Sequence, residues 1–371
     1  MTTTPLRPNT LAIDLDAAAH NARAVRGLIG AERKLFAVVK ADGYGYGASE
    51  MGAVFLRNGA DYLAVADLSE GVRLRQHGIK APILVYPNSL PEAAADTLAH
   101  GLIPTLVDLD AARAYSQAAT GPCEIFVKVD IGLERLGIPA EQAVKTILAM
   151  LELRHLRLGG ICAHPHSEVG SDPAYADWQL GRFTAVVDEL EARGVRVPVR
   201  LSAATPWVLR FPHTYLNAVD PGRMLYGMVF PGETPPVPLR STFHAFTTRV
   251  IALRELTPRE RFAEAAPFPV RAPMRLGVIP MGSADGLRWL NAGRVLVRGQ
   301  AAPIIGSPSL EHTRIDLTGT PDARVGDEVV IIGRQGNLEI TQAEVASRHG
   351  LGLHHVATTV GPRVTRVYLS S

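Results

Sequence analysis

A lysine at the end of an apolar run is the first residue of this chain whose type suggests chemistry. Lys40 follows "LFAVV" and precedes "ADGYGYG", a run of small residues with two tyrosines. An ammonium group at the end of a buried strand is costly unless it is paired or neutralised. The chain has only five lysines, of which Lys40 and Lys128 lie in strand patterns. Because a buried lysine can lose its proton and form a Schiff base, we interpret Lys40 as a covalent nucleophile.

The elements that would position this lysine alternate regularly as far as Pro235. The strand patterns are "LFAVVKA", "DYLAVAD", "PILVYP", "IPTLVD", "CEIFVKVD", "LRLGGICAH", "VRVPVRLS" and "LNAVD", with helical segments between them. Such alternation predicts parallel β/α units. About eight units indicate an α/β fold with a closed (β/α)8 TIM-like barrel, and an open doubly wound sheet is the alternative.

A proline-rich segment, "GETPPVPLRS", ends this alternation, and only short strands and turns follow it. We therefore expect a barrel over residues 1–236 and an all-β domain over residues 237–371. The segment at residues 10–17, "TLAIDLDA", reads as an extra strand before the barrel and is a candidate strand of the β domain.

Active sites of such barrels lie at the carboxyl ends of the strands. The polar residues expected there are Lys40, Lys128, Asp130, His164, Ser202, Thr205 and Asp220. Each alone is more often structural than functional. The last two strand-end loops, "LSAATPW" and "VDPGRMLYG", occupy the place where barrels often bind phosphate, and Gly222 would let backbone amides approach an anion closely. A lysine facing a phosphate site suggests pyridoxal 5'-phosphate, whereas ordinary turns are the alternative.

Composition excludes several classes of protein. The chain has 371 residues, 47% of them apolar and 20% charged, with a net charge of +2. These values fit a two-domain globular enzyme, and without a basic cluster we expect neither nucleic acid nor a membrane as a partner. Cys123 and Cys162 lie in apolar runs and read as reduced core residues. Since no export pattern or membrane-length apolar run is seen, we expect a cytoplasmic protein.

The segment "VVKADGYGYG" resembles the cofactor-lysine signature of the alanine racemase family, the fold type III pyridoxal-phosphate enzymes. The segments "KVDIGLERLG", "GGICAHPH", "VDPGRMLYGM", "IPMGSADG", "VGDEVVIIG" and "GPRVTRVYLS" follow in the order typical of that family. The resemblance covers nearly the whole chain. It implies pyridoxal 5'-phosphate as cofactor, a small amino acid as substrate, and a head-to-tail homodimer in which each chain completes its partner's active site.

The resemblance also implies roles for single residues. Lys40 would bind the cofactor as an aldimine and act as a base on one face, with Tyr44 lying against the cofactor. Arg135 would hold the substrate carboxylate, and Lys128 matches a lysine that is often carbamylated in the family and steadies that arginine. The other implied cofactor contacts are His164 near the pyridine ring and Thr205, Gly222 and the backbone of Arg223 at the phosphate.

One departure from the family concerns the pyridine nitrogen. Members normally carry an arginine where this chain has Asp220, and that arginine contacts the ring nitrogen. An arginine cannot accept a proton, whereas an aspartate favours a protonated ring, which is the stronger electron sink. The structural alternative is that Asp220 simply pairs with a nearby base such as Arg223.

A second departure concerns the second catalytic base. The family's tyrosine is replaced by Ser283, and a serine hydroxyl is a poor acid or base without an activating partner. The tyrosine near the phosphate is replaced by His354, which is a candidate for the missing base or only a phosphate contact. The family usually has a methionine–aspartate pair that helps to bind the substrate carboxylate. This chain has Leu310 and Glu311 at those positions.

Three functions remain open at this level. The first is an amino-acid racemase or epimerase whose second base is His354 or a water held by Ser283. The second is a one-base lyase, such as a D-amino-acid aldolase, dehydratase or decarboxylase, with Lys40 serving the D face. Either "AHPH" with Glu168 or His354 with His355 would then supply a group for a substrate side-chain hydroxyl. The third, a non-catalytic cofactor carrier, is disfavoured by the β domain. We expect alanine to be a poor substrate, and we predict no metal site, because two adjacent histidines are weak evidence for one.

Overall fold

The chain forms two compact units in a computed structural model that describes residues 7–166, 172–258, 268–270, 272–286 and 292–370. One unit contains Ala17–Arg240, and the other combines Met1–Asp16 with Ser241–Ser371. Glu168, considered above as an assisting group, lies outside the described residues. Among the described helices, none combines the length and apolar character needed to cross a membrane.

Eight parallel strands close into a barrel within the described part of the first unit. Each strand pairs with the next, and the last pairs with the first. The predicted closed barrel is therefore confirmed, and the open sheet is wrong. In order around the barrel the strands are β2 (Lys34–Val38), β3 (Tyr62–Val65), β4 (Ile83–Val85), β5 (Ile103–Leu106), β6 (Cys123–Asp130), β8 (Leu156–Cys162), β9 (Val199–Ala204) and β10 (Ala218–Asp220).

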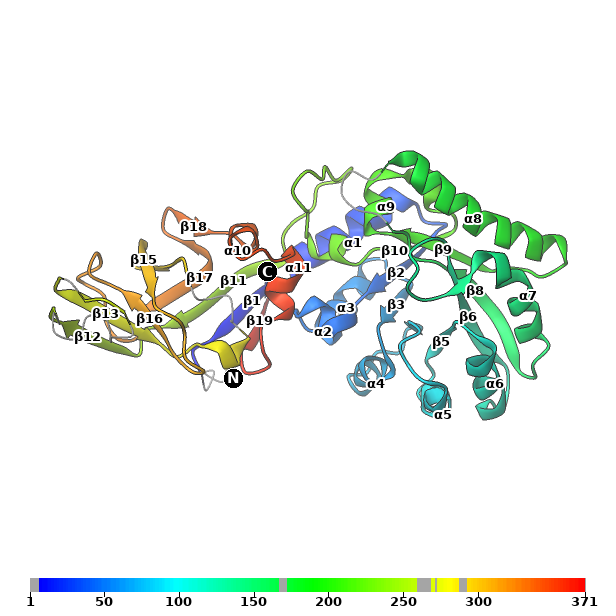
Figure 1. The fold of residues 1–371 in the computed structure, drawn as a ribbon, viewed down its shortest axis with the longest axis horizontal. Coiled ribbons are helices and arrows are strands. Elements are labelled where there is room, and N and C mark those ends of the chain that lie inside the picture. The colour runs from blue at the N-terminus through cyan, green and yellow to red at the C-terminus, as the bar shows by residue number, and fades with distance from the viewer. Residues whose placement is uncertain (1–6, 167–171, 259–267, 271, 287–291, 371) are drawn as a thin grey trace. The chain divides into compact units, whose positions relative to one another are not determined.

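Helices alternate with these strands along the chain and cover the outside of the barrel (Figure 1). The strands are buried on both faces, and for this reason their sequences are continuously apolar rather than alternating. A short strand, β7 (Ile138–Pro139), adds to the end of β6. The helices are α1 (Leu15–Ile29), α2 (Lys40–Tyr44), α3 (Ala48–Arg57), α4 (Leu68–Gln76), α5 (Ala94–Ala99), α6 (Leu109–Ala118), α7 (Ala140–Leu151), α8 (Pro173–Ala192) and α9 (Thr205–Arg210).

Most strands of the barrel contribute one or two side chains to its interior. Successive side chains of a strand point to opposite faces, so a residue two positions beyond an interior residue also points inward, nearer the carboxyl end. This alternation decides which strand-end residues can meet. The buried interior cluster contains Phe36, Val38, Ala64, Leu84, Phe126, Cys162, Val199, Leu201 and Ala218.

The second unit is built around one sheet, in the order β12-β13-β16-β15-β14-β17-β11-β1-β19. Its N-terminal strand, β1, pairs antiparallel with β11 and parallel with β19. The elements are β1 (Thr10–Asp14), β11 (Phe243–Arg249), β12 (Ala252–Leu256), β13 (Met274–Ile279), β14 (Arg294–Val297), β15 (Gln300–Ile305), β16 (Thr313–Asp316), β17 (Glu328–Gln335), β18 (Leu338–Ile340), β19 (Thr365–Leu369), α10 (Gln342–Arg348) and α11 (Leu353–Thr358).

The barrel unit starts and ends later than the expected range of residues 1–236. It begins at Ala17, because the strand before it is paired into the β sheet, and it ends at Arg240. The side chain of Asn21 explains the later end. Its amide nitrogen donates to the Arg240 carbonyl at 2.7 Å, and its oxygen accepts from the Arg240 N–H at 2.8 Å. These bonds fix the proline-rich segment against α1.

Candidate active site

Five polar side chains occupy the inward-pointing positions at the carboxyl end of the barrel. Each stands two residues after a member of the interior cluster, so the alternation described above directs all of them to one mouth. Four were expected there, and the tyrosine was not. They are Lys40 after Val38, Tyr86 after Leu84, Lys128 after Phe126, His164 after Cys162 and Asp220 after Ala218.

Lys40 lies in a partly desolvated, cation-rich environment. Its Nζ atom is 5.9 Å from the centre of the Tyr86 ring. Burial lowers the pKa of Lys40, Asp220 opposes that change, and Arg135 and Lys128 add to it. A lysine whose pKa is lowered carries more of the neutral amine, which is the form that acts as nucleophile or base.

Two other groups at this mouth are also held toward their neutral forms. Burial, with the nearby Arg135 cation, lowers the pKa of Lys128, which is only 7% exposed. Burial, with the nearby Lys40 ammonium, lowers the pKa of His164 to about 3. His164 is therefore a neutral imidazole near pH 7, suited to packing against a flat ring rather than to carrying charge.

The backbone after Lys40 adopts an uncommon left-handed turn. The φ angles are 53° at Ala41, 52° at Asp42, 61° at Gly43 and 56° at Tyr44. Each non-glycine residue in this conformation costs about 1–2 kcal/mol. The turn therefore needs support from its surroundings, and that support fixes the direction of the Lys40 side chain.

Glu70, in the first turn of α4, supplies that support. Its Oε1 atom accepts from the N–H groups of Ala41 at 2.6 Å and Asp42 at 3.4 Å, and its Oε2 atom accepts from Ala66 at 2.8 Å. The residue is 7% exposed, so these bonds form away from water. One carboxylate thus joins the ends of β2 and β3 beside the reactive lysine.

Asp130 supports the loop that carries Arg135, as Glu70 supports the turn after Lys40. Its Oδ1 atom accepts from the N–H groups of Gly132 at 2.9 Å, Leu133 at 3.0 Å and Glu134 at 3.2 Å, and its Oδ2 atom accepts from Arg135 at 3.2 Å. Burial on its own would raise the pKa of Asp130, but these four backbone hydrogen bonds together lower the pKa below its usual value. The carboxylate orders the loop that carries the arginine.

Asp220 does not pair with Arg223, so that structural alternative is wrong. Instead the Tyr86 hydroxyl donates to Asp220 Oδ2 at 2.6 Å. Arg223 makes a buried bidentate ion pair with Glu233, with one nitrogen–oxygen distance of 2.6 Å. The other oxygen of Asp220, Oδ1, is buried and has no hydrogen-bond partner among the described residues.

The loops after β9 and β10 are joined through the side chain of Thr205. The Thr205 hydroxyl accepts from the Gly222 N–H at 3.0 Å and faces the Met224 N–H at 3.5 Å. A Cβ atom at Gly222 would lie 2.1 Å from the Tyr44 hydroxyl, which shows that only glycine fits beneath this tyrosine. The structure thus brings together Thr205, Gly222 and Tyr44, three of the residues expected at the cofactor.

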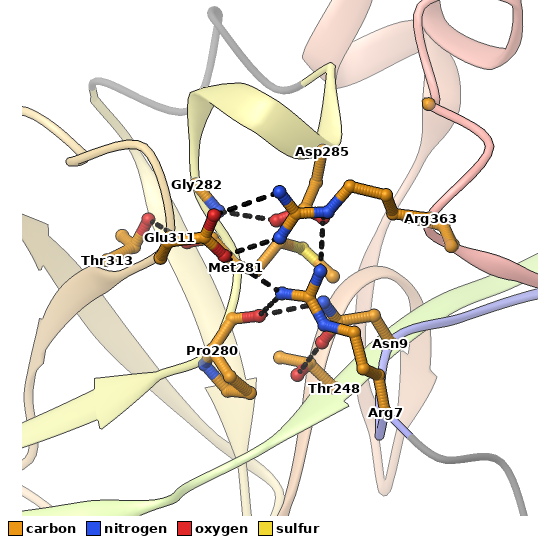
Figure 2. A network of polar contacts seen from close by, with 12 residues as sticks. Arg7, Asn9, Thr248, Pro280, Met281, Gly282, Asp285, Glu311, Thr313 and Arg363 are labelled. Atoms are coloured by element: carbon orange, nitrogen blue, oxygen red, sulfur yellow. Dashed lines mark hydrogen bonds and ion pairs between the residues drawn. The ribbon is translucent and has the colours of Figure 1, made fainter.

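The remaining candidate residues lie in the β unit. Ser283 begins a short 3-10 turn (Ser283–Asp285), and its N–H donates to the Ser309 carbonyl at 2.9 Å. Leu310 is 68% exposed. Glu311 pairs with Arg363 and lies 3.5 Å from Arg7, in the network that Figure 2 shows. His354 lies in α11, its ring centre 4.1 Å from that of His355.

The barrel mouth fits the expected cofactor. Pyridoxal 5'-phosphate needs a lysine for its aldehyde, backbone amides for its phosphate and a partner for its ring nitrogen. Lys40 would supply the first and the loop at Gly222 the second, and Asp220 Oδ1, a buried acceptor with no partner among the described residues, would supply the third. No group of three His, Cys, Asp or Glu side chains in the described part of the chain could hold a metal ion.

Two residues of this site were missed in the sequence. Tyr86 ends "PILVY", and its position two residues after an interior leucine would have identified it. Glu70 stands three residues after Asp67, a spacing typical of a helix capping box. The Asp67 side chain does accept from the Glu70 N–H at 3.1 Å, but the Glu70 carboxylate reaches neighbouring strands instead. The local pattern conceals a tertiary role.

Comparison with known proteins agrees with this geometry. The family model "Alanine racemase, N-terminal domain" matches residues 13–229, and "Alanine racemase, C-terminal domain" matches residues 243–368. The chain is 37% identical to an alanine racemase of Desulfosudis oleivorans, over 96% of this chain and 95% of that protein. It is 34% identical to an alanine racemase of Desulfovibrio desulfuricans, over 98% of each.

Solved structures give the same result. The alanine racemase of Bacillus anthracis with bound L-Ala-P is 27% identical and superposes with a TM-score of 0.91, over 99% of this chain and 96% of that one. The alanine racemase of Clostridium difficile 630 is 26% identical with a TM-score of 0.90, over 99% and 97%. With Lys40, the Gly222 loop and both domains in place, the chain belongs to the alanine racemase family of pyridoxal-phosphate-dependent racemase-type isomerases.

Proposed function

We propose that this enzyme acts at the Cα atom of a small amino acid, as a racemase or epimerase with a second base other than tyrosine. The observation that carries the proposal is the group of cations at the barrel mouth. Lys40, Lys128 and Arg135 act on one another electrostatically there, with Asp220 as the opposing charge. Such a site favours an anionic cofactor and a substrate carboxylate.

Pyridoxal 5'-phosphate supplies an electron sink for the charge that develops when a Cα bond breaks. The chain itself supplies binding and proton transfer. Lys40 is the base on one face, because its lowered pKa leaves a larger share of it unprotonated near neutral pH. Arg135, on the loop ordered by Asp130, binds the substrate carboxylate, and Lys128 lies close enough to act on it electrostatically.

The base for the opposite face is the open part of the proposal. The Ser283 hydroxyl makes no hydrogen bond to another described residue, so no base of the described chain activates it. A water bound by Ser283 or the imidazole of His354 are the two candidates, and the histidine is the stronger acid–base group near pH 7. With Leu310 and Glu311 also replacing the family's residues, we expect alanine to be a poor substrate.

A one-base lyase is the second candidate, and Asp220 is the observation that favours it. An aspartate at the ring nitrogen strengthens the electron sink, and elimination, retro-aldol cleavage and decarboxylation need only one base in the enzyme. Lys40 would then serve D-amino acids alone. For either reaction we place the enzyme in the cytoplasm as a homodimer with shared active sites, on the strength of the family resemblance.

The reaction is identified by incubating purified enzyme with separate D- and L-amino acids in heavy water. Exchange of the α-proton with inversion supports two bases. Exchange with retention, or release of an aldehyde, ammonia or carbon dioxide, supports the lyase. Lys40→Ala serves as the inactive control. A colourless protein that borohydride cannot label after incubation with pyridoxal 5'-phosphate would contradict both reactions.

Replacement of Ser283 by tyrosine tests the second base directly. If only that hydroxyl is missing, Ser283→Tyr raises the racemisation rate while leaving cofactor content unchanged. His354→Phe distinguishes the remaining candidates, because it abolishes inversion only if the imidazole is the second base. Unchanged inversion in His354→Phe together with loss of inversion in Ser283→Ala assigns the role to the water.

A further inference from the structure

A hydrogen-bonded pair of a partly buried tyrosine and a buried aspartate spans the barrel mouth from the end of β4 to the end of β10. The Tyr86 hydroxyl donates to Asp220 Oδ2 at 2.6 Å, and Asp220 is 5% exposed. Tyr86 is not among the family positions considered above. The acceptor of this pair, Asp220, stands where the family normally has an arginine.

The Tyr86 hydroxyl is the donor of this hydrogen bond, and Asp220 is the acceptor. Burial and the neighbouring Asp220 raise the pKa of Tyr86 well above its usual value, so the phenol keeps its proton. A phenol has one proton to donate, and the accepting oxygen is therefore unprotonated. The bond from Tyr86 favours the ionised form of Asp220 and opposes burial, which raises the pKa of Asp220 to about 6. Near pH 7 Asp220 is therefore mainly a carboxylate, and its second oxygen accepts.

That second oxygen, Oδ1, has no partner among the described residues, and an unsatisfied buried acceptor is costly. Lys40 and Lys128 are the cations that act on Asp220, but neither forms an ion pair with it in the described structure. Burial raises the pKa of Tyr44 and of Cys162, the other titratable groups near Asp220, so neither adds a negative charge there.

One polar group of the cofactor fits this acceptor. The aldehyde is taken by Lys40 and the phosphate by the loop at Gly222, two residues after Asp220. These contacts leave two polar groups, the ring hydroxyl and the ring nitrogen. The hydroxyl is next to the aldehyde carbon and would stay beside Lys40, whereas the nitrogen lies across the ring and is the group left for this acceptor. A carboxylate oxygen can partner it only if the nitrogen carries a proton.

We propose that Asp220 holds the ring nitrogen of bound pyridoxal 5'-phosphate in its protonated form, and that Tyr86 is the positioning residue that keeps Asp220 ionised and oriented. The inference rests on the proposed function, because it requires the cofactor to bind at Lys40. It adds that this enzyme's electron sink is stronger than an arginine at the same position would allow. Reactions that place the most negative charge on the ring gain most from it.

The test is nitrogen NMR of the holoenzyme loaded with 15N-labelled cofactor. We expect the ring nitrogen of the wild type to resonate as a protonated pyridine across neutral pH. In Asp220→Asn the resonance moves to the position of a neutral pyridine. In Tyr86→Phe it moves part of the way, because the carboxylate loses its donor and competes for the proton. Tyr62→Phe, which alters a tyrosine at the amino end of β3, is the matched control and leaves the resonance unchanged.

The outcomes separate the inference from the proposed function. If borohydride still links the cofactor to Lys40 but the wild-type ring nitrogen is neutral, the inference is wrong and the proposed function stands. If the cofactor does not bind at all, both are wrong. A Tyr86→Phe spectrum identical to the wild type, at full cofactor occupancy, assigns the effect to Asp220 alone and overturns the role of Tyr86. Should Tyr86→Phe fail to fold, Tyr86→Trp and Tyr86→Leu provide the same comparison.

Discussion

Two buried aspartates, one in each unit, differ in how completely they are paired. Asp285 in the β unit is fully buried, and its oxygens contact Arg7 at 3.3 Å, Arg363 at 3.4 Å and the Gly282 N–H at 2.9 Å (Figure 2). Asp220 in the barrel is bonded through one oxygen and leaves the other unpartnered among the described residues. The first arrangement is complete within the described chain, whereas the second leaves one acceptor, which we propose a ligand completes.

The difference separates scaffold from site. The network of Arg7, Asp285, Glu311 and Arg363 balances two positive with two negative charges and holds the turn that begins at Ser283. The barrel mouth instead gathers Lys40 and Lys128, whose pKa values are both lowered by burial. A charge that the chain leaves desolvated and incompletely paired is a functional signal.

The largest expected effect comes from removing the reactive lysine. Lys40→Ala should abolish borohydride labelling by the cofactor and lower the catalytic rate by at least about 100-fold, because the base and the covalent link are lost together. Thermal stability of the cofactor-free protein should stay the same or rise, since a buried amine is removed. Lys80→Ala, on an exposed lysine, is the control. Retained labelling in Lys40→Ala would refute the assignment of the site.

Glu70→Ala should break the link between the barrel strands and the left-handed turn. It leaves buried N–H groups without acceptors, each costing about 1–3 kcal/mol. We expect lower stability and a slower reaction of Lys40 with the cofactor, and hydrogen exchange should increase at Ala41, Asp42 and Ala66. Glu50→Ala, on an exposed glutamate of α3, is the matched control. Normal exchange at Ala41 would show that Glu70 does not hold the turn.

Asp285→Ala should give the opposite pattern from Lys40→Ala. Two partly exposed arginines lose a buried partner, and we expect a loss of about 2 kcal/mol in unfolding free energy, less than for a fully buried pair. Borohydride labelling of Lys40 should persist, because the barrel forms a separate unit. Urea unfolding and cofactor labelling measure the two properties independently. If labelling were lost while stability held, the distinction between scaffold and site would fail.

A smaller effect is the pH dependence contributed by Asp220 to the cofactor-free protein. Burial raises its pKa from 3.8 to about 6, so the folded state binds more protons than the unfolded state between these values. Stability therefore falls as pH rises through this window, by on the order of 2 kcal/mol. The difference in unfolding free energy between the wild type and Asp220→Asn isolates this contribution from that of His164. A difference that does not change between pH 4 and 6 contradicts the raised pKa.

Several elements could be predicted because their signals are local. The alternation of apolar strands with helices indicated the barrel, and the positions of Lys40, Lys128, His164 and Asp220 at strand ends followed from it. The position of the domain boundary did not follow, since it depends on the bonds between Asn21 and Arg240, far apart in the chain.

The contacts between distant segments could not be predicted from the sequence. The sequence analysis identified neither Glu70 nor Tyr86 as site residues, and it gave Arg223 as a possible partner of Asp220. In the fold, Arg223 bonds Glu233 and Asp220 bonds Tyr86, because the barrel brings β4 and β10 to the same mouth. Partner choice depends on side-chain direction, which sequence spacing does not fix.

By itself, the sequence determined the order of elements, the reactive lysine and the replacements at Asp220 and Ser283, because periodicity and residue type are properties of the chain alone. The tertiary structure decided which carboxylates are satisfied and which one is left for a ligand. Barrel closure brings together residues more than a hundred positions apart, such as Tyr86 and Asp220, and burial gives their pairing its electrostatic strength.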